Sequence, residues 1–275
     1  MNSSKVLVVI TTYNRIYYLE QAIQSVLSQS YKDIEILISD NSTNEDSREM
    51  IEKNFKDKVL YHRSGYGLSP LDHGMYIEKF VQKEFNHEFL TFFHDDDLMA
   101  TSHIETAVQL LNKNSVAAVS ASSITIDIDG AIIGKKSYLK MFLDKRIFGY
   151  WGVLSVCWLN PMICPSIVYR KNQRNLSAED FSETSLGYHD YSSNIFTIYK
   201  YGAIISSKET FYYREHDGQD SASFSNEHFE LHIKARNAAL QKINLNVVAE
   251  NFARFIFSIL DFLYIKYKKI KSYSK

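Results

Sequence analysis

The sequence predicts an α/β fold, with a mostly parallel sheet that carries helices on both faces, followed by C-terminal helices. Three observations predict this class. The chain has 275 residues, 45% of them hydrophobic, so it can bury a large core. Strand-like and helix-like segments alternate along the first 126 residues, which is typical of a parallel sheet with helical crossovers. The run at residues 5–10 is apolar without alternation, as expected for a strand buried on both faces.

Each element of the first half is predicted from its own pattern. β-branched and apolar residues at 5–10 predict the first strand, and apolar side chains at helical spacing predict a helix over 16–27. Ser102 and Glu105 stand at the spacing of a capping box, which predicts a helix start. By the same criteria we expect further strands at 34–39, 59–62, 89–93 and 116–126, and helices at 43–55, 75–85 and 104–111.

The second half is predicted to be less regular, with a mixed extension of the sheet. Residues 149–165, which include Trp151 and Trp158, are expected to form an irregular loop. The elements expected here are strands at 166–169, 203–206 and 210–213 and helices at 188–199 and 227–243.

Composition argues against several classes of protein. Lys and Arg number 31 against 32 Asp and Glu, so the chain lacks the basic excess of most nucleic-acid-binding proteins. Its two cysteines, Cys157 and Cys164, cannot supply a four-thiolate zinc site, and they fit a reducing compartment. The apolar run at 6–10 is too short for a signal-peptide core or a membrane span. We therefore expect a cytoplasmic protein that does not bind nucleic acid.

The C-terminal segment has a different character. Residues 252–265 are almost wholly apolar or aromatic, with Arg254 and Asp261 as interruptions, and five lysines follow within the last ten residues. An apolar helix with a basic tail fits the surface of an anionic membrane, so we expect peripheral contact with the inner face of the plasma membrane. The alternative is a helix that docks on the domain and ends in a frayed tail.

Three adjacent carboxylates, Asp95, Asp96 and Asp97, directly follow the strand expected at 89–93. They would repel one another unless a cation neutralised them, and open α/β sheets bind ligands beyond the carboxyl ends of their strands. A hard divalent ion, Mg²⁺ or Mn²⁺, takes such oxygen ligands together with substrate phosphates. The alternative is a solvated acidic turn that caps the next helix.

A second polar pair, Asp40 and Asn41, follows the strand expected at 34–39. A carboxylate there can accept the imide N–H of uracil, and Tyr13, just past the first strand, offers a face on which the ring can stack. Taken alone, the pair is more simply an Asx turn at the start of the next helix.

Five fragments with these and later residues follow one another in a characteristic order. They are Thr-Thr-Tyr-Asn-Arg at 11–15, Ser-Asp-Asn-Ser at 39–42, His-Asp-Asp-Asp at 94–97, Gly-Tyr-His-Asp-Tyr at 187–191, and Tyr-Arg-Glu-His at 213–216 with Ser221. Together they resemble a family 2 glycosyltransferase of the GT-A (Rossmann-like) fold. The likeness covers residues 5–221.

The resemblance implies a role for each matching residue. Asp190 matches the general base, and Asp96 the ligand of a Mn²⁺ or Mg²⁺ ion, with Asp97 and His216 near that ion. Arg214 would stabilise the departing diphosphate. The nucleotide, usually UDP, would be held by Thr11, Tyr13, Arg15, Asp40, Arg63 and Asp95.

Two positions depart from the family pattern. Relatives often have Asp where this chain has His94, which leaves open whether Asp97 joins Asp96 at the ion. Relatives often have Glu where this chain has His189, and a histidine beside Asp190 favours the ionised carboxylate more than a second acid would.

The expected reaction is an inverting transfer of a sugar from a nucleotide sugar to a hydroxyl of a glycan or lipid-linked acceptor in bacterial surface polysaccharide synthesis. Asp190 would take the proton, because a sugar hydroxyl is a poor nucleophile at neutral pH. The segment at 149–165 would be either core packing or an aromatic platform for the acceptor. We expect a GT-A domain at 1–225, with a nucleotide-binding part at 1–126 and an acceptor-binding part at 127–225, and a C-terminal helical segment at 226–275.

The alternative from another class is a non-catalytic nucleotide-sugar-binding subunit of a polysaccharide assembly. It is disfavoured because every ionisable site residue is present. An NAD dehydrogenase would need a Gly-rich turn after the first strand, and a P-loop phosphotransferase a Gly-Lys-Ser/Thr sequence, and the chain has neither.

Overall fold

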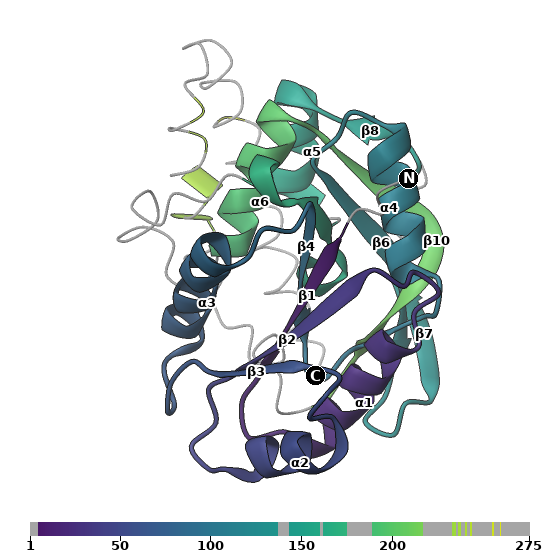
Figure 1. Cartoon of the computed structure of the whole chain (residues 1–275). Coiled ribbons are helices and arrows are strands. Elements are labelled where there is room, and N and C mark those ends of the chain that lie inside the picture. Colours follow the sequence, from purple (N-terminus) through teal and green to yellow (C-terminus); the bar gives the residue numbers. More distant parts are fainter. Residues whose placement is uncertain are drawn as a thin grey trace, which may run out of the picture.

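The computed structural model describes residues 5–136, 143–159, 162–174 and 189–216, together with residues 233, 234, 236, 237, 240, 243, 255 and 259. The side chains at 136, 155–159 and 189–192 lie outside this description. The expected α/β class, with a central sheet between two layers of helices, is confirmed (Figure 1).

The described residues form one ten-stranded mixed sheet. Its strands are β1 (Val6–Thr12), β2 (Ile34–Asp40), β3 (Leu60–Arg63), β4 (Phe89–His94), β5 (Leu98–Met99), β6 (Ala118–Ile126), β7 (Ile132–Lys136), β8 (Arg146–Ile147), β9 (Val168–Arg170) and β10 (Ala203–Arg214). The order across the sheet is β3-β2-β1-β4-β9-β6-β10-β5, with β7 paired to β6 and β8 to β10. β9 runs antiparallel to both of its neighbours, β4 and β6.

The helices form a layer on each face of the sheet (Figure 1). They are α1 (Ile16–Leu27), α2 (Asp46–Asn54), α3 (Pro70–Glu84), α4 (His103–Lys113), α5 (Gly149–Leu159) and α6 (His189–Lys200). Helices α1, α2 and α4 share one core with Val8 of β1, whereas Leu7 packs on the opposite face with α3. Neighbouring residues of β1 therefore enter different cores, which explains why this strand is apolar throughout.

The carboxyl ends of six strands lie at one edge of the sheet, one of them β3, which runs parallel to β2. β1, β2 and β4 are mutually parallel, and β6 and β10 run in the same direction as β4. The register pairs Thr12 with Asp40, Thr11 with His94, and Arg214 with Ile126. This edge thus collects the polar residues that follow each strand.

The prediction of an irregular loop at 149–165 is wrong. Its first part is α5, and a 3₁₀ turn follows at Cys164–Ser166. Because α5 is apolar almost throughout, its sequence shows no helical periodicity. Val153 is fully buried and Trp151 is exposed, so Trp151 is not a core residue.

Other boundaries also differ from the expectation. The strands expected at 203–206 and 210–213 are one strand, β10, whose pairing with β6 shifts register between Ser206 and Phe211. α3 begins at Pro70 because Ser69 caps it, with its Oγ accepting from the Asp72 N–H. The prediction of a capping box at Ser102 and Glu105 is wrong. Ser102 makes no side-chain hydrogen bond to the helix end, and Glu105 accepts a hydrogen bond from Ser30 Oγ at 2.6 Å. β5, β7 and β8 were not predicted.

The remaining elements expected within the first 126 residues are confirmed. The helices expected at 227–243 and 252–265 lie largely outside the described residues. Among the helices that are described, none combines the length and the apolar character needed to cross a bilayer.

Candidate active site

Asp95 is a buried carboxylate at the end of β4. Its Oδ2 accepts a hydrogen bond from Thr12 Oγ1 at 2.7 Å and one from the Tyr13 N–H at 3.4 Å. Burial, and after it the negative charge of Asp96, raise the pKa of Asp95 to about 7, although the Thr12 bond and the charge of Arg15 act against this rise. The loop after β1 is thereby fastened to the loop after β4.

Thr12, which was not among the expected nucleotide-binding residues, contacts this carboxylate. Alternate residues of a strand point to opposite faces, and the Oγ1 of Thr11 lies 3.5 Å from the Phe93 carbonyl oxygen. Sequence reasoning missed Thr12 because the two threonines are adjacent and both follow the apolar run.

Asp96 faces two basic side chains. Arg15 Nη1 lies 2.9 Å from Asp96 Oδ2 and 3.4 Å from Asp95 Oδ1. Nε2 of His216 lies 3.1 Å from the same Asp96 Oδ2. The structure therefore brings together four of the expected site residues, from the loops after β1, β4 and β10.

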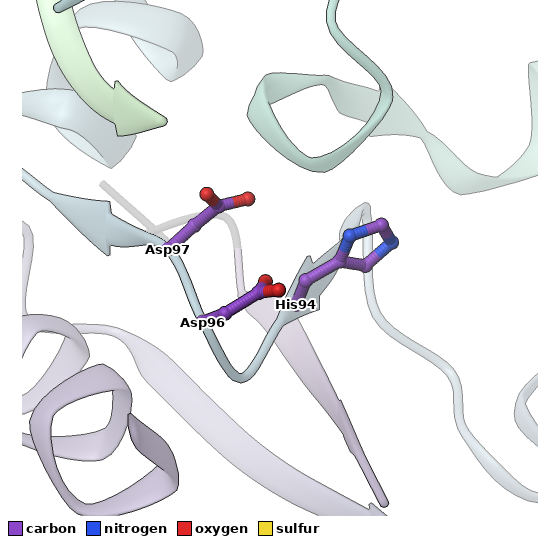
Figure 2. A group of neighbouring side chains, drawn as sticks. All are labelled: His94, Asp96 and Asp97. Carbon is purple, nitrogen blue, oxygen red and sulfur yellow. The ribbon is translucent and has the colours of Figure 1, made fainter. Parts of the chain in front are cut away.

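His94, Asp96 and Asp97 form a group that could hold a metal ion. Figure 2 shows His94 at the end of β4 and the two aspartates on the turn that leads to β5, and one ligand atom of each residue lies within 4.8 Å of the others. Carboxylate oxygens suit Mg²⁺ and Mn²⁺, whereas an imidazole nitrogen favours a transition metal. The donor set thus fits a divalent ion, and it fits Mn²⁺ better than Mg²⁺. His94, which replaces an acid of the family pattern, belongs to this group.

Arg214 is fully buried and is bound to the protein itself. Its Nε donates to the Asp96 carbonyl oxygen at 2.7 Å, and its Nη1 donates to the carbonyl oxygens of Asp127 and Ile128 at 3.1 and 2.8 Å. Its Nη2 donates to Gln21 Oε1 at 2.9 Å. This geometry favours a positioning role for Arg214, and its expected stabilisation of the departing diphosphate stays a prediction.

Tyr18 of α1 contacts both basic residues at the end of β10, Arg214 and His216. The Arg214 guanidinium carbon lies 4.9 Å from the Tyr18 ring centroid, and the His216 ring lies 5.4 Å from it, centroid to centroid. Tyr18 and Gln21 are three residues apart and so share one face of α1. Sequence reasoning missed both, because nothing in α1 indicates contact with a segment almost 200 residues later.

The loop after β2 is built around Asp40, which is fully buried. Its Oδ1 accepts from the Ser42 N–H at 2.8 Å, and its Oδ2 accepts from Tyr61 Oη at 2.8 Å and pairs with Arg63 Nη1 at 3.2 Å. Burial, with the hydrogen bond to Asp40, raises the pKa of Tyr61 above its usual range. Tyr61 was missed because it lies within a strand.

Arg63 and its surroundings form the outer part of this loop. Its guanidinium lies 4.7 Å from the Tyr66 ring centroid and donates to the carbonyl oxygens of Ser42 and Asn44. Gly67 has a φ of +76°, and a Cβ there would lie 3.1 Å from Thr43 Cγ2, so a glycine is required. Tyr13 is 48% exposed beside this loop.

Asp190 lies in the first turn of α6, which begins at His189. Its side chain lies outside the described residues, as do Ser221 and the other residues at 217–232. The expected role of Asp190 therefore stays a prediction.

Comparison with known proteins gives a family. Residues 7–169 match the model of glycosyl transferase family 2. A GalNAc(5)-diNAcBac-PP-undecaprenol beta-1,3-glucosyltransferase from Campylobacter jejuni is 30% identical over 115 residues, which cover 40% of this chain and 35% of that protein. An uncharacterized glycosyltransferase from Rickettsia felis is 31% identical over 170 residues, which cover 61% of this chain and 26% of that protein. The alignments thus span about a third or less of these relatives.

Solved structures share the fold. The crystal structure of S. aureus TarS 1-349 in complex with UDP-GlcNAc has a TM-score of 0.64 at 15% identity, with 90% of this chain and 69% of that chain covered. The mannosyltransferase PcManGT from Pyrobaculum calidifontis, in complex with GDP-Man and Mn²⁺, has a TM-score of 0.54 at 14% identity, with 99% and 84% covered. At such identities the likeness shows the fold alone.

Proposed function

This chain belongs to glycosyl transferase family 2, and on that premise we propose that it transfers a sugar from a UDP-sugar to a hydroxyl of a lipid-linked or other glycan, with inversion. The observation that carries the proposal is the convergence of the loops after β1, β4 and β10 on Asp95 and Asp96. Nucleotides bind at this edge of open α/β sheets. The 1–126 part would then hold the donor, and the 127–225 part the acceptor.

We propose that the nucleotide base stacks on Tyr13, whose ring is half exposed. Both oxygens of Asp40 already accept hydrogen bonds, so Asp40 would act on the base through Tyr61 and Arg63, which it holds in place. Arg63, with Tyr66 against its guanidinium, would close over the nucleotide. Thr11 would shape the start of this loop.

The leaving diphosphate develops negative charge, which needs a cationic partner. Asp96, with His94 and Asp97 beside it, would hold a divalent ion that supplies Lewis-acid stabilisation of that charge. Asp95 would face the ribose, and His216 would orient Asp96. Arg214 would hold the turn that carries Asp96 in place, through its hydrogen bond to the Asp96 carbonyl oxygen.

On the acceptor side, a carboxylate must take the hydroxyl proton as the new C–O bond forms. We propose Asp190 for this step. Its place in the first turn of α6 supports the assignment, because the helix dipole stabilises an ionised carboxylate there.

The name of the Campylobacter relative, an undecaprenol-linked glucosyltransferase, supports a lipid-linked acceptor and a role in bacterial surface polysaccharide synthesis. We propose that the protein works at the inner face of the plasma membrane through residues 252–275, which follow the described domain. Deleting 252–275 should move the protein from the membrane fraction to the supernatant, and unchanged partitioning would contradict this part of the proposal.

The proposed function is tested by donor turnover. The full chain is incubated with UDP-, GDP- and dTDP-sugars, with extracted lipid-linked glycans as the acceptor and with Mn²⁺ or a chelator, and release of the nucleoside diphosphate is measured. We expect release from a UDP-sugar only with metal, and loss of that release in Asp96→Asn. Asp57→Asn, on the exposed turn that precedes β3, is the matched control and should keep wild-type turnover.

Two results would contradict the proposal. Turnover at the wild-type rate in Asp96→Asn would remove the metal from the mechanism. Tight UDP binding without turnover of any donor, with extracted lipid-linked glycans present, would favour a non-catalytic nucleotide-sugar-binding subunit.

A further inference from the structure

Arg15 occupies the position of a cation at the carboxylate expected to bind the metal. Its Nη1 lies 2.9 Å from Asp96 Oδ2 and 3.4 Å from Asp95 Oδ1. The two carboxylate side chains are only 7% and 4% exposed, so they have little solvent to screen their mutual repulsion. The guanidinium therefore supplies a positive charge that offsets the repulsion between the two carboxyl groups.

A divalent ion and Arg15 compete for the same atoms. An ion held by Asp96, with His94 and Asp97, would lie within a few ångströms of the guanidinium, and two cations at that distance repel strongly in a buried site. Asp96 Oδ2 also faces His216, so its surroundings are already crowded. Metal binding at Asp96 thus requires Arg15 to give way.

The Arg15 side chain can move toward solvent, whereas the backbone on both sides of Arg15 is held in place. The Arg15 side chain is 30% exposed, so a change of rotamer can turn it toward solvent. Asn14 is pinned to the loop after β2, since its N–H donates to Ser42 Oγ and its Oδ1 accepts from the Thr43 N–H. Helix α1 starts at Ile16, directly after Arg15. Only the side chain needs to move.

We propose that Arg15 is an internal counter-ion that a divalent metal displaces from Asp96, and that the released guanidinium then binds the donor diphosphate. This inference rests on the proposed function, because it assumes the metal and the nucleotide sugar. A guanidinium fits phosphate oxygens in a bidentate manner, and the displaced group lies beside the ion that those oxygens would contact. The metal releases the Arg15 guanidinium, and the diphosphate gives that guanidinium a new anionic partner. Binding of the metal and binding of the diphosphate should therefore strengthen each other.

The test compares Mn²⁺ affinity with and without UDP, measured on the full chain by titration calorimetry and by the EPR signal of free Mn²⁺. In Arg15→Gln, Mn²⁺ alone should bind about tenfold more tightly than in wild type, because its competitor is gone. The tightening of Mn²⁺ binding by UDP should shrink by about the same factor. Arg48→Gln, on the exposed face of α2, removes the same charge far from the site and should match wild type.

The outcomes separate this inference from the proposed function. If wild type binds no Mn²⁺ even with UDP present, the metal site itself fails. If wild type binds Mn²⁺ but Arg15→Gln matches Arg48→Gln or binds Mn²⁺ alone more weakly, the counter-ion role is overturned and the metal site stands.

A second measurement uses wild-type protein, in case Arg15→Gln does not fold. Labelling of arginines with phenylglyoxal is followed by peptide mass spectrometry. Mn²⁺ alone should increase the labelling of Arg15, and adding UDP should protect it. Labelling of Arg15 that falls or stays constant with Mn²⁺ alone would overturn the proposal.

Discussion

Replacing Arg214 by methionine should destabilise the protein severely. The side chain is fully buried and donates to three carbonyl oxygens, those of Asp96, Asp127 and Ile128, and to the amide oxygen of Gln21. Methionine has similar length and no donor, so all four acceptors lose their partner, and the buried Asp96 carbonyl oxygen has no water to replace it. A buried polar group left without its partner costs about 1–3 kcal/mol.

We expect the free energy of unfolding to fall by about 3–5 kcal/mol in Arg214→Met, less than the simple sum because the acceptors share one site. Arg214→Lys should lose about 2 kcal/mol, because one ammonium cannot reach both the Asp96 turn and the turn at Asp127 and Ile128. Gly130, whose Cβ would lie 3.8 Å from Arg214 Nη1, closes this turn with a φ of +88°.

The assay is equilibrium unfolding in urea, with Arg170→Met as the matched control. Arg170 also donates to a backbone carbonyl, that of Leu111, and pairs with Glu88, but it is 25% exposed. Water can replace its partners, so its loss should cost about 1 kcal/mol. If the free energies of unfolding of Arg214→Met and Arg170→Met differ by less than about 1 kcal/mol, the hydrogen bonds of Arg214 do not stabilise the protein as argued.

Four further predictions follow from the site and the core. Asp190→Asn should lower turnover by about 10²–10⁴-fold with an unchanged melting temperature, and near wild-type turnover would exclude it as the base. Chelation with EDTA should abolish donor turnover, and Mn²⁺ should restore it in wild type but not in Asp96→Asn, as a coupled assay for UDP would show. Tyr61→Phe should lower the urea midpoint by an amount equivalent to about 1–2 kcal/mol, because the buried Asp40 loses a donor, and an unchanged midpoint would contradict that. Burial lowers the pKa of His103 to about 4 from its ordinary 6.5, so the unfolded state binds more protons between these values and stability falls as the pH drops from 6.5 to 4. His103→Gln should remove about 1.4 kcal/mol per pH unit from that slope in urea unfolding, and an identical slope would refute the assignment.

The acidic run and the polar loops could be placed at one edge of the sheet from sequence, because parallel strands end on the same side. The partners within the site could not. Thr12, the neighbour of the expected Thr11, contacts Asp95, because adjacent residues of a strand point to opposite faces. Likewise, helix α5 could not be predicted from sequence, because a helix that is apolar on all sides shows no periodic pattern of apolar residues.

The sequence by itself determined the alternation of strands and helices, because local periodicity records which side of each element meets a core. It also indicated which residues are expected to carry the chemistry, through their order after the strands. Only the tertiary structure decided what those residues touch. Arg214 reaches Gln21 across 193 residues, and Arg15 meets Asp96 across 81. Such contacts depend on strand order, register and burial, which are set by packing between distant segments and leave no trace in local pattern.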